Sequence, residues 1–177
     1  MKFFLALFVA LSIASASALS ANSRSPNPVI KAMANGMTLL KPAFVAEAKL
    51  QANILGRSID TDEVTREIEA EVKQKPIVVY TYGLSPFSTE AIQILESTGY
   101  EYEKIELGKE WFLLGGKNSV KRVLLSDKVE TGATSLPKVF VNGQCIGGCA
   151  ELAEAVETGA LETLMLKKQS KPAFSLW

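Results

Sequence analysis

The chain has 177 residues and no formal net charge, with 47% hydrophobic and 21% charged residues, a composition typical of one globular domain with extensions. The balanced charge argues against a nucleic-acid-binding surface, and no nucleic-acid partner is expected. The sequence contains no histidine, which excludes the commonest general base, the Ser-His and Cys-His nucleophile pairs and most zinc sites.

The N-terminal residues have the features of targeting segments. Residues 1–18 combine Lys2, an apolar stretch and a run of small residues, which predicts a secretory signal peptide. The apolar stretch is too short for a permanent bilayer anchor, so no membrane span is expected in the mature chain. Residues 19–37 are rich in Ser, Asn, Ala and Pro and contain no acidic residue, which predicts a transit-like or disordered segment.

This arrangement resembles the two-part presequence of algae whose plastid is entered through the secretory route. The Ala-Ser-Ala junction is followed by a bulky residue, Leu19, as in those presequences. The resemblance implies entry into the secretory route and the plastid of a secondary-plastid alga as the destination. Secretion, or residence in an endomembrane lumen, is the alternative.

Residues 38–72 are predicted to form a helical extension. Apolar residues share one face of a helix over 38–55, in which Pro42 is tolerated only near the first turn. Asp60 and Glu63, three residues apart, predict the start of a second helix that continues to about residue 74.

Residues 73–168 alternate strand-like and helix-like segments. The strands are expected at 77–80, 100–107, 138–141 and 144–146. Asn142-Gly143 is a strong hairpin signal between the last two. With helices after the first, second and fourth strands, this order predicts an α/β sandwich, followed by a tail over 169–177.

The helices of this domain have recognisable start and stop signals. Ser85 as N-cap and Pro86 at the first helical position predict a helix that Gly99 ends. A second helix is expected at 119–129, with Lys121 and Arg122 facing outward, and a third near 149–157.

Two segments of this domain resemble the glutaredoxin branch of the thioredoxin fold. Residues 135–137, Ser-Leu-Pro, are similar to the Thr-Val-Pro of that family, whose proline is cis and presents backbone groups to glutathione. Residues 139–149 match the family's hairpin and glycine pair almost residue for residue. The resemblance implies a thioredoxin-like (glutaredoxin) three-layer α/β sandwich with a four-stranded mixed sheet and an N-terminal helical extension.

The family's Cys-x-x-Cys motif corresponds here to Ser85-Pro86-Phe87-Ser88. A cysteine at this position works because the helix N-terminus lowers a thiol pKa that begins at about 8.5. A serine would need a base to remove its proton, and the chain has no histidine. Ser85 is therefore predicted to cap the helix rather than to attack disulfides. Without this thiolate, no iron–sulfur cluster or other metal is expected.

The resemblance implies a glutathione site that depends mainly on backbone groups. Its residues would be Tyr82, Phe87, Leu136, Pro137, Gly148, Cys149 and Ala150. Tyr82 replaces the family's lysine and offers a hydroxyl without charge. Ala150 replaces the polar residue that holds the γ-glutamyl amine, for which Glu151 could substitute. Glutathione binding is therefore expected to be weak.

Cys145 and Cys149 are the two cysteines. Cys149 begins a helix, so we expect a lowered pKa and moderate exposure, which makes it the candidate reactive thiol. Cys145 lies in a strand and is interpreted as a small buried hydrophobe. The pair could close a disulfide, but two free thiols are favoured.

Two functions remain open on the residues alone. The combined departures at the site favour a non-catalytic module that binds glutathione or a protein partner. The alternative is a glutathione-dependent thiol-disulfide oxidoreductase that uses Cys149, with or without Cys145. Trp111 and Phe112, in the loop 111–114, either pack against the N-terminal helix or anchor a protein partner, and the same choice applies to the C-terminal tail.

Overall fold

The computed structural model describes residues 28–169, without the side chains of 28–39, 111 and 168–169. The predicted signal peptide, residues 19–27 of the transit-like segment and nearly all of the C-terminal tail lie outside the described residues. The helices are α2 (Pro28–Leu55), α3 (Thr61–Glu71), α4 (Pro86–Thr98), the 3-10 helix η1 (Trp111–Leu113), α5 (Gly116–Ser126), α6 (Cys149–Glu157) and α7 (Ala160–Gln169). The strands are β1 (Ile77–Tyr82), β2 (Tyr102–Gly108), β3 (Lys138–Val141) and β4 (Gln144–Gly147).

The four strands form one mixed sheet in the order β2-β1-β3-β4. β1 is parallel to β2 and antiparallel to β3, which is antiparallel to β4. The turn between β3 and β4 has positive φ angles at Asn142 (51°) and Gly143 (82°), as a two-residue hairpin of this kind requires. The predicted four-stranded mixed sheet and its hairpin are confirmed.

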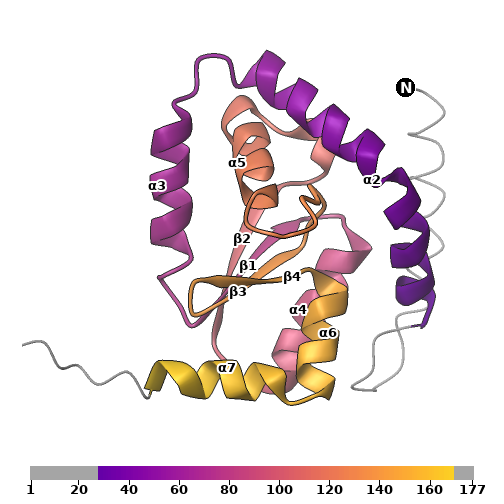
Figure 1. Cartoon of the computed structure of the whole chain (residues 1–177), viewed down its shortest axis with the longest axis vertical. Helices are drawn as coiled ribbons and strands as arrows, with labels where there is room; N and C mark the ends of the chain where they lie inside the picture. The colour runs from indigo at the N-terminus through magenta and orange to yellow at the C-terminus, as the bar shows by residue number, and fades with distance from the viewer. Residues whose placement is uncertain (1–27, 170–177) are drawn as a thin grey trace, which may run out of the picture.

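Helices cover both faces of the sheet and give the expected three layers (Figure 1). On one face, side chains of α3 and α5 pack on β1 and β3 around Tyr80 and Phe140. The two rings meet edge to face, with 5.7 Å between their centroids. On the other face, α4, α6 and α7 pack on residues such as Val79 and Val139. The alternation of side chains along β1 and β3 produces these two separate cores.

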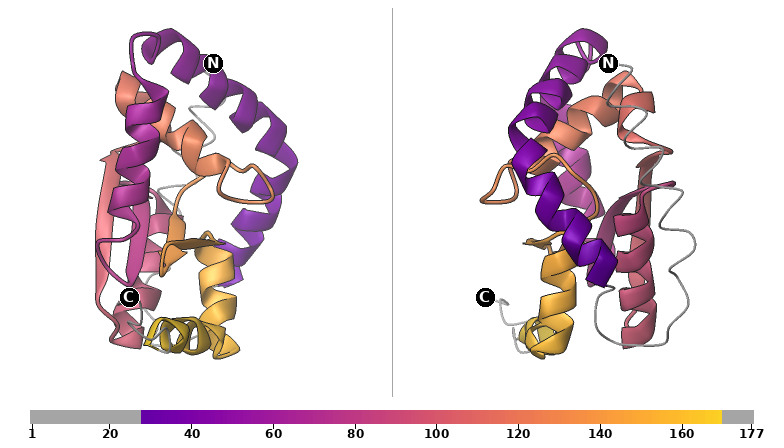
Figure 2. Two further views of the ribbon diagram at one scale, coloured as in Figure 1. Left: turned by 60° about the vertical axis from the view of Figure 1, so that its left-hand side comes forward. Right: turned by 90° about the vertical axis from the view of Figure 1, so that its right-hand side faces the viewer.

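The long helix α2 lies outside the three layers and packs on α5 (Figure 2). It begins at Pro28 rather than at residue 38, because proline fits a first turn, where its missing N–H is not needed. Pro42 therefore stands in the helix interior rather than in the first turn. There it cannot donate to the carbonyl of Thr38, and the ribbon bends near its middle (Figure 1).

The predicted helix caps are confirmed. Asp60 accepts from the amides of Asp62 and Glu63 at the start of α3. Ser85 caps α4, and Gly99 ends that helix in the left-handed conformation. No helix within residues 28–169 has both the length and the apolarity needed to cross a membrane.

The prediction that Lys121 and Arg122 face outward from α5 is wrong. Both side chains are buried, with 4% and 2% of their surface exposed. Lys121 bonds Glu67 and Glu71 of α3, and Arg122 bonds Glu47 of α2. The helical extension flanks α5 and supplies carboxylates to a face that would otherwise be solvated.

Candidate functional site

The start of α4 is built from two buried serines. The Ser85 hydroxyl accepts from the Ser88 amide at 3.3 Å, and the Ser88 hydroxyl accepts from the Tyr82 amide at 3.2 Å. Ser85 is 7% exposed and Ser88 is 2% exposed. Both hydroxyls therefore serve the backbone of the strand-to-helix turn, as predicted for Ser85.

The loop before β3 contains a cis peptide between Leu136 and Pro137, as the family resemblance implies. Both residues are buried, and Leu136 packs into the core under α3 and α5. A Cβ on Gly148 would lie 3.2 Å from the Pro137 carbonyl oxygen, so the glycine allows the α6 start to approach the proline closely. The structure thus brings the predicted proline and glycine segments together.

The start of α6 offers fewer free amides than expected. The Gly148 amide donates to the Glu151 carboxylate at 2.8 Å, as in a capping box. The first-turn amides of Cys149 and Ala150 have no acceptor within the helix itself. Ala150 lies exposed beside them. Phe87, on α4, packs against the core of that face.

The expectation that Cys149 has a lowered pKa is wrong. Its side chain is 7% exposed and belongs to the core between α4 and α6. Burial, together with the charges of Glu90 and Glu151, raises the pKa of Cys149 to about 12. The helix N-terminus does not compensate, because the thiol points into the core.

The predicted alternative of a disulfide is also not realised, since Cys145 and Cys149 are both free. Cys145 packs toward the core under α3 and α5, whereas Cys149 belongs to the core on the opposite face of the sheet. Burial raises the pKa of Cys145 as well. The preference for two free thiols agrees with this arrangement.

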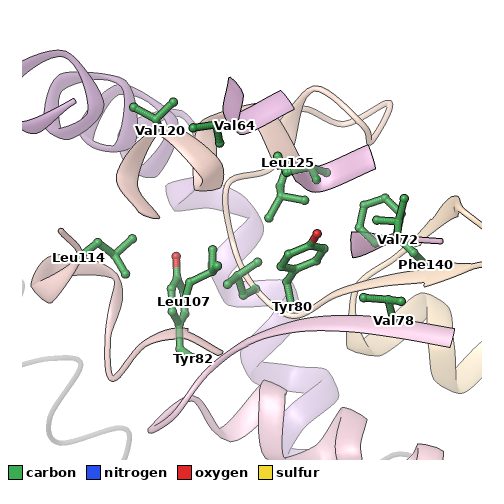
Figure 3. Close-up of a cluster of buried hydrophobic side chains, with 12 residues drawn as sticks. Val64, Val72, Val78, Tyr80, Tyr82, Leu107, Leu114, Val120, Leu125 and Phe140 are labelled. Atoms are coloured by element: carbon green, nitrogen blue, oxygen red, sulfur yellow. The ribbon is translucent and has the colours of Figure 1, made fainter. Parts of the chain in front are cut away.

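The Tyr82 hydroxyl, which the sequence analysis assigns to the glutathione site, is turned into the protein. Tyr82 lies two residues after Tyr80 on β1, so both rings extend toward the same side of the sheet (Figure 3). Tyr82 is 5% exposed, and burial raises the pKa of its hydroxyl against the opposing effect of Arg122.

The loop 111–114 is partly buried and partly exposed. Leu114 is buried in the core, whereas Phe112 and Leu113 are 37% and 65% exposed. The side chain of Trp111 lies outside the described part of the chain.

The polar groups nearest the cis-proline loop were missed by the sequence analysis. Arg122 Nε donates to the Thr134 carbonyl oxygen at 3.1 Å, and Thr134 Oγ1 donates to the Phe44 carbonyl oxygen at 3.4 Å. Lys138 Nζ donates to the Ser135 carbonyl oxygen, and burial lowers the pKa of Lys138 to about 8. Nothing in the sequence around a lysine or arginine on a helix or strand indicates that its side chain will be buried in this way.

No group of three or more His, Cys, Asp or Glu side chains within residues 28–169 is placed to hold a metal ion. The polar groups around the cis-proline loop are instead amides, carbonyls, hydroxyls and the two basic side chains. Such a set can bind a peptide-like or carboxylate-bearing ligand.

Comparison with known proteins identifies relatives of one family, although no family model matches the chain. Monothiol glutaredoxin-S12, chloroplastic, of Arabidopsis thaliana is 26% identical over 136 residues, covering 77% of this chain and 72% of the relative. Glutaredoxin-C6 of Oryza sativa subsp. japonica is 31% identical over 94 residues, covering 53% of this chain and 78% of the relative.

Solved structures give the same relationship. Oxidized glutaredoxin 2 from Chlamydomonas reinhardtii matches with a TM-score of 0.53 and 26% identity, over 63% of this chain and 99% of that chain. A buckwheat glutaredoxin–glutathione complex shares the fold, with a TM-score of 0.52 and 21% identity over 60% of this chain and 91% of that chain. The sheet, the cis-proline loop and these relatives agree, and the chain belongs to the glutaredoxin family, with a thioredoxin-like fold.

Proposed function

We propose that this protein is a non-catalytic glutaredoxin that binds glutathione, or a protein segment, beside Pro137. The observation that carries the proposal is the state of the two serines at the start of α4. The hydroxyls of Ser85 and Ser88 are both buried, and each accepts a hydrogen bond from a backbone amide. A serine nucleophile needs a base beside it, and the chain has no histidine.

The cysteines give little support to the oxidoreductase alternative. A thiol must be accessible and ionised to attack a disulfide. Cys149 is buried and its pKa is raised to about 12, and the pKa of Cys145 is raised too. Neither thiol therefore supplies an appreciable amount of thiolate near neutral pH.

Glutathione fits the backbone part of the site better than the side-chain part. A peptide-like ligand could pair with the backbone of Leu136 and direct a carboxylate toward the amides of Cys149 and Ala150. Tyr82 is turned into the core, and the Gly148 amide is engaged by Glu151, so fewer contacts remain than the family pattern would provide. These losses support weak binding.

An assay of glutathione-dependent disulfide reduction tests this proposal. The full chain should show no turnover above the uncatalysed rate, and a Cys145→Ser, Cys149→Ser double variant should behave identically. Ser85→Cys places a thiol at a helix N-terminus and should introduce measurable exchange. Turnover by the unaltered chain at the rate of a glutaredoxin measured alongside it would overturn the proposal.

We also propose that the protein works in a plastid reached through the secretory route. Support comes from the two-part composition of residues 1–37 and from the relative that is named chloroplastic. A fluorescent protein fused behind residues 1–37, expressed in an alga with a secondary plastid, should accumulate in that plastid. Fluorescence that stays in the medium or in the endomembrane lumen would contradict the proposal.

A further inference from the structure

A carboxylate from the added helix α2 lies on a buried guanidinium next to the candidate site. Arg122 Nη1 donates to Glu47 Oε2 at 2.9 Å. The Arg122 side chain is 2% exposed, whereas that of Glu47 is 32% exposed. The guanidinium is thus held inside the protein, and its carboxylate partner reaches it from the outer side.

Arg122 also connects this ion pair with the cis-proline loop. Its Nε donates to the Thr134 carbonyl oxygen, and Thr134 Oγ1 donates in turn to the Phe44 carbonyl oxygen of α2. Helix α2, Arg122 and the loop that leads to Pro137 therefore form one hydrogen-bonded unit. Arg122 thus contacts both the ion-pair carboxylate and the loop directly.

The surroundings of the ion pair are basic. Lys138 and Lys41 lie close enough for their charges to act on one another, and Arg122 acts on both Lys138 and the Tyr82 hydroxyl. Glu47 is the carboxylate that forms an ion pair with Arg122. Negative charge also acts in this region, from Glu151 on Lys138 and from Glu110 on the Tyr82 hydroxyl.

Leaving a buried guanidinium without its anionic partner is costly, and its planar fork matches the geometry of carboxylates in general. Less than two thirds of this chain is enough to match nearly the whole length of the solved relatives. A large part of this chain therefore has no counterpart in them. In this chain the anionic partner of Arg122 is Glu47, which α2 of the same chain supplies.

We propose that Glu47 is an internal carboxylate ligand of Arg122, and that α2 competes with the carboxylate of an incoming glutathione or peptide for this guanidinium. This inference rests on the proposed binding function. In this structure Glu47 of α2 occupies the Arg122 guanidinium. The external ligand binds this guanidinium only to the extent that Glu47 dissociates from it.

Titration of reduced glutathione into the isotopically labelled full chain, followed by NMR, tests the competition. Glu47→Gln keeps the side-chain size but removes the charge, and we expect it to lower the Kd for glutathione about tenfold. The control Glu69→Gln changes an exposed glutamate of α3 and should leave the Kd unchanged. Addition of glutathione to the unaltered chain should also accelerate hydrogen exchange of the α2 amides around Ala48.

A double-mutant cycle assigns the effect to the guanidinium. In an Arg122→Gln background, Glu47→Gln should no longer change the Kd, because the contested group is absent. If the Glu47→Gln chain does not fold, Glu47→Asp replaces it. The shorter side chain keeps the charge but draws the carboxylate back from the guanidinium, so it should lower the Kd likewise.

The outcomes separate this inference from the proposed function. An unchanged Kd in Glu47→Gln, with glutathione bound by the unaltered chain, overturns the internal ligand and leaves the binding function standing. A tighter Kd that persists in the Arg122→Gln background also overturns it. If no variant binds glutathione at millimolar concentration, glutathione binding and the competition both fail.

Discussion

Lys121 Nζ lies 2.8 Å from Glu71 Oε1 and 2.8 Å from Glu67 Oε1, between helices α5 and α3. Glu71 also accepts from the Tyr80 hydroxyl at 2.7 Å, so the same carboxylate reaches the central strand β1. The Lys121 ammonium thereby joins α5 to α3 through two carboxylates, and Glu71 joins α3 to the sheet. The ion pairs are buried on the lysine side and partly solvated on the glutamate side.

Removing this ammonium should destabilise the fold. In Lys121→Ala the Glu67 and Glu71 carboxylates each lose one of their partners, although Glu67 keeps Lys117 and Glu71 keeps the Tyr80 hydroxyl. We therefore expect a loss of about 2 kcal/mol, below that of a fully broken buried pair. Urea unfolding followed by circular dichroism measures the change. Lys117→Ala is the control, since this exposed lysine also bonds Glu67 and its loss should have a much smaller effect. Equal effects of the two substitutions would contradict this account.

The same network should make stability depend on acid. Hydrogen bonds from Lys117 and Lys121 lower the pKa of Glu67 from 4.5 to about 2. Because the folded-state pKa lies below that of the unfolded chain, the stabilisation is complete above pH 4.5 and is lost as the pH falls toward 2. Urea midpoints between pH 7 and pH 2.5 should fall further for the unaltered chain than for Glu67→Gln. Parallel curves for the two proteins would show that Glu67 does not contribute.

Local signals predicted the framework of the site well, because their partners lie within one turn. Ser85, Gly99 and Asp60 act on neighbouring amides or on their own backbone, and the sequence displays each cap with its partner. The hairpin and the cis-proline loop could be placed for the same reason, with the family resemblance added.

The burial of charged and sulfur groups could not be predicted in this way. Arg122 finds its carboxylate 75 positions earlier in the chain, and nothing near it in the sequence indicates that contact. The position of Cys149 at a helix start was correct, but the direction of its thiol depends on how α6 packs against α4. The burial of Arg122 and the direction of the Cys149 thiol were therefore predicted wrongly because tertiary packing determines them.

The contact between α2 and α5 should be sensitive to a single methyl group. A Cβ on Gly116 would lie 2.3 Å from the Leu55 carbonyl oxygen, a backbone atom that cannot rotate away, whereas one on Gly115 would meet nothing within 4 Å. Gly116→Ala should cost about 1–3 kcal/mol of unfolding free energy. Gly115→Ala, which changes only the N-cap of α5, should cost less, up to about 1 kcal/mol. Thermal and urea unfolding of the pair measures the difference. Similar stability of the two variants would mean that α2 does not dock as described.

The Ser88 hydroxyl should matter for folding, whatever its part in the chemistry of the site. It accepts from the buried amide of Tyr82, which Ser88→Ala would leave without that acceptor. We expect a loss of about 1–3 kcal/mol in urea unfolding. Ser97→Ala is a suitable comparison, because the Ser97 hydroxyl donates to a carbonyl of its own helix, and its removal should be nearly neutral. A neutral Ser88→Ala would show that water replaces the hydroxyl.

Cys149 should react slowly with alkylating reagents for two separable reasons. Its pKa is raised to about 12, so at pH 8 only about one thiol in ten thousand is ionised, and the side chain is also buried. We expect iodoacetamide to modify it roughly a thousandfold or more slowly in the folded chain than in urea, with a rate that still rises tenfold per pH unit up to pH 9. Mass spectrometry of a Cys145→Ser chain isolates this thiol. Rapid labelling that levels off near pH 7 would instead reveal a lowered pKa, and would return Cys149 to the position of a reactive thiol at the start of α6.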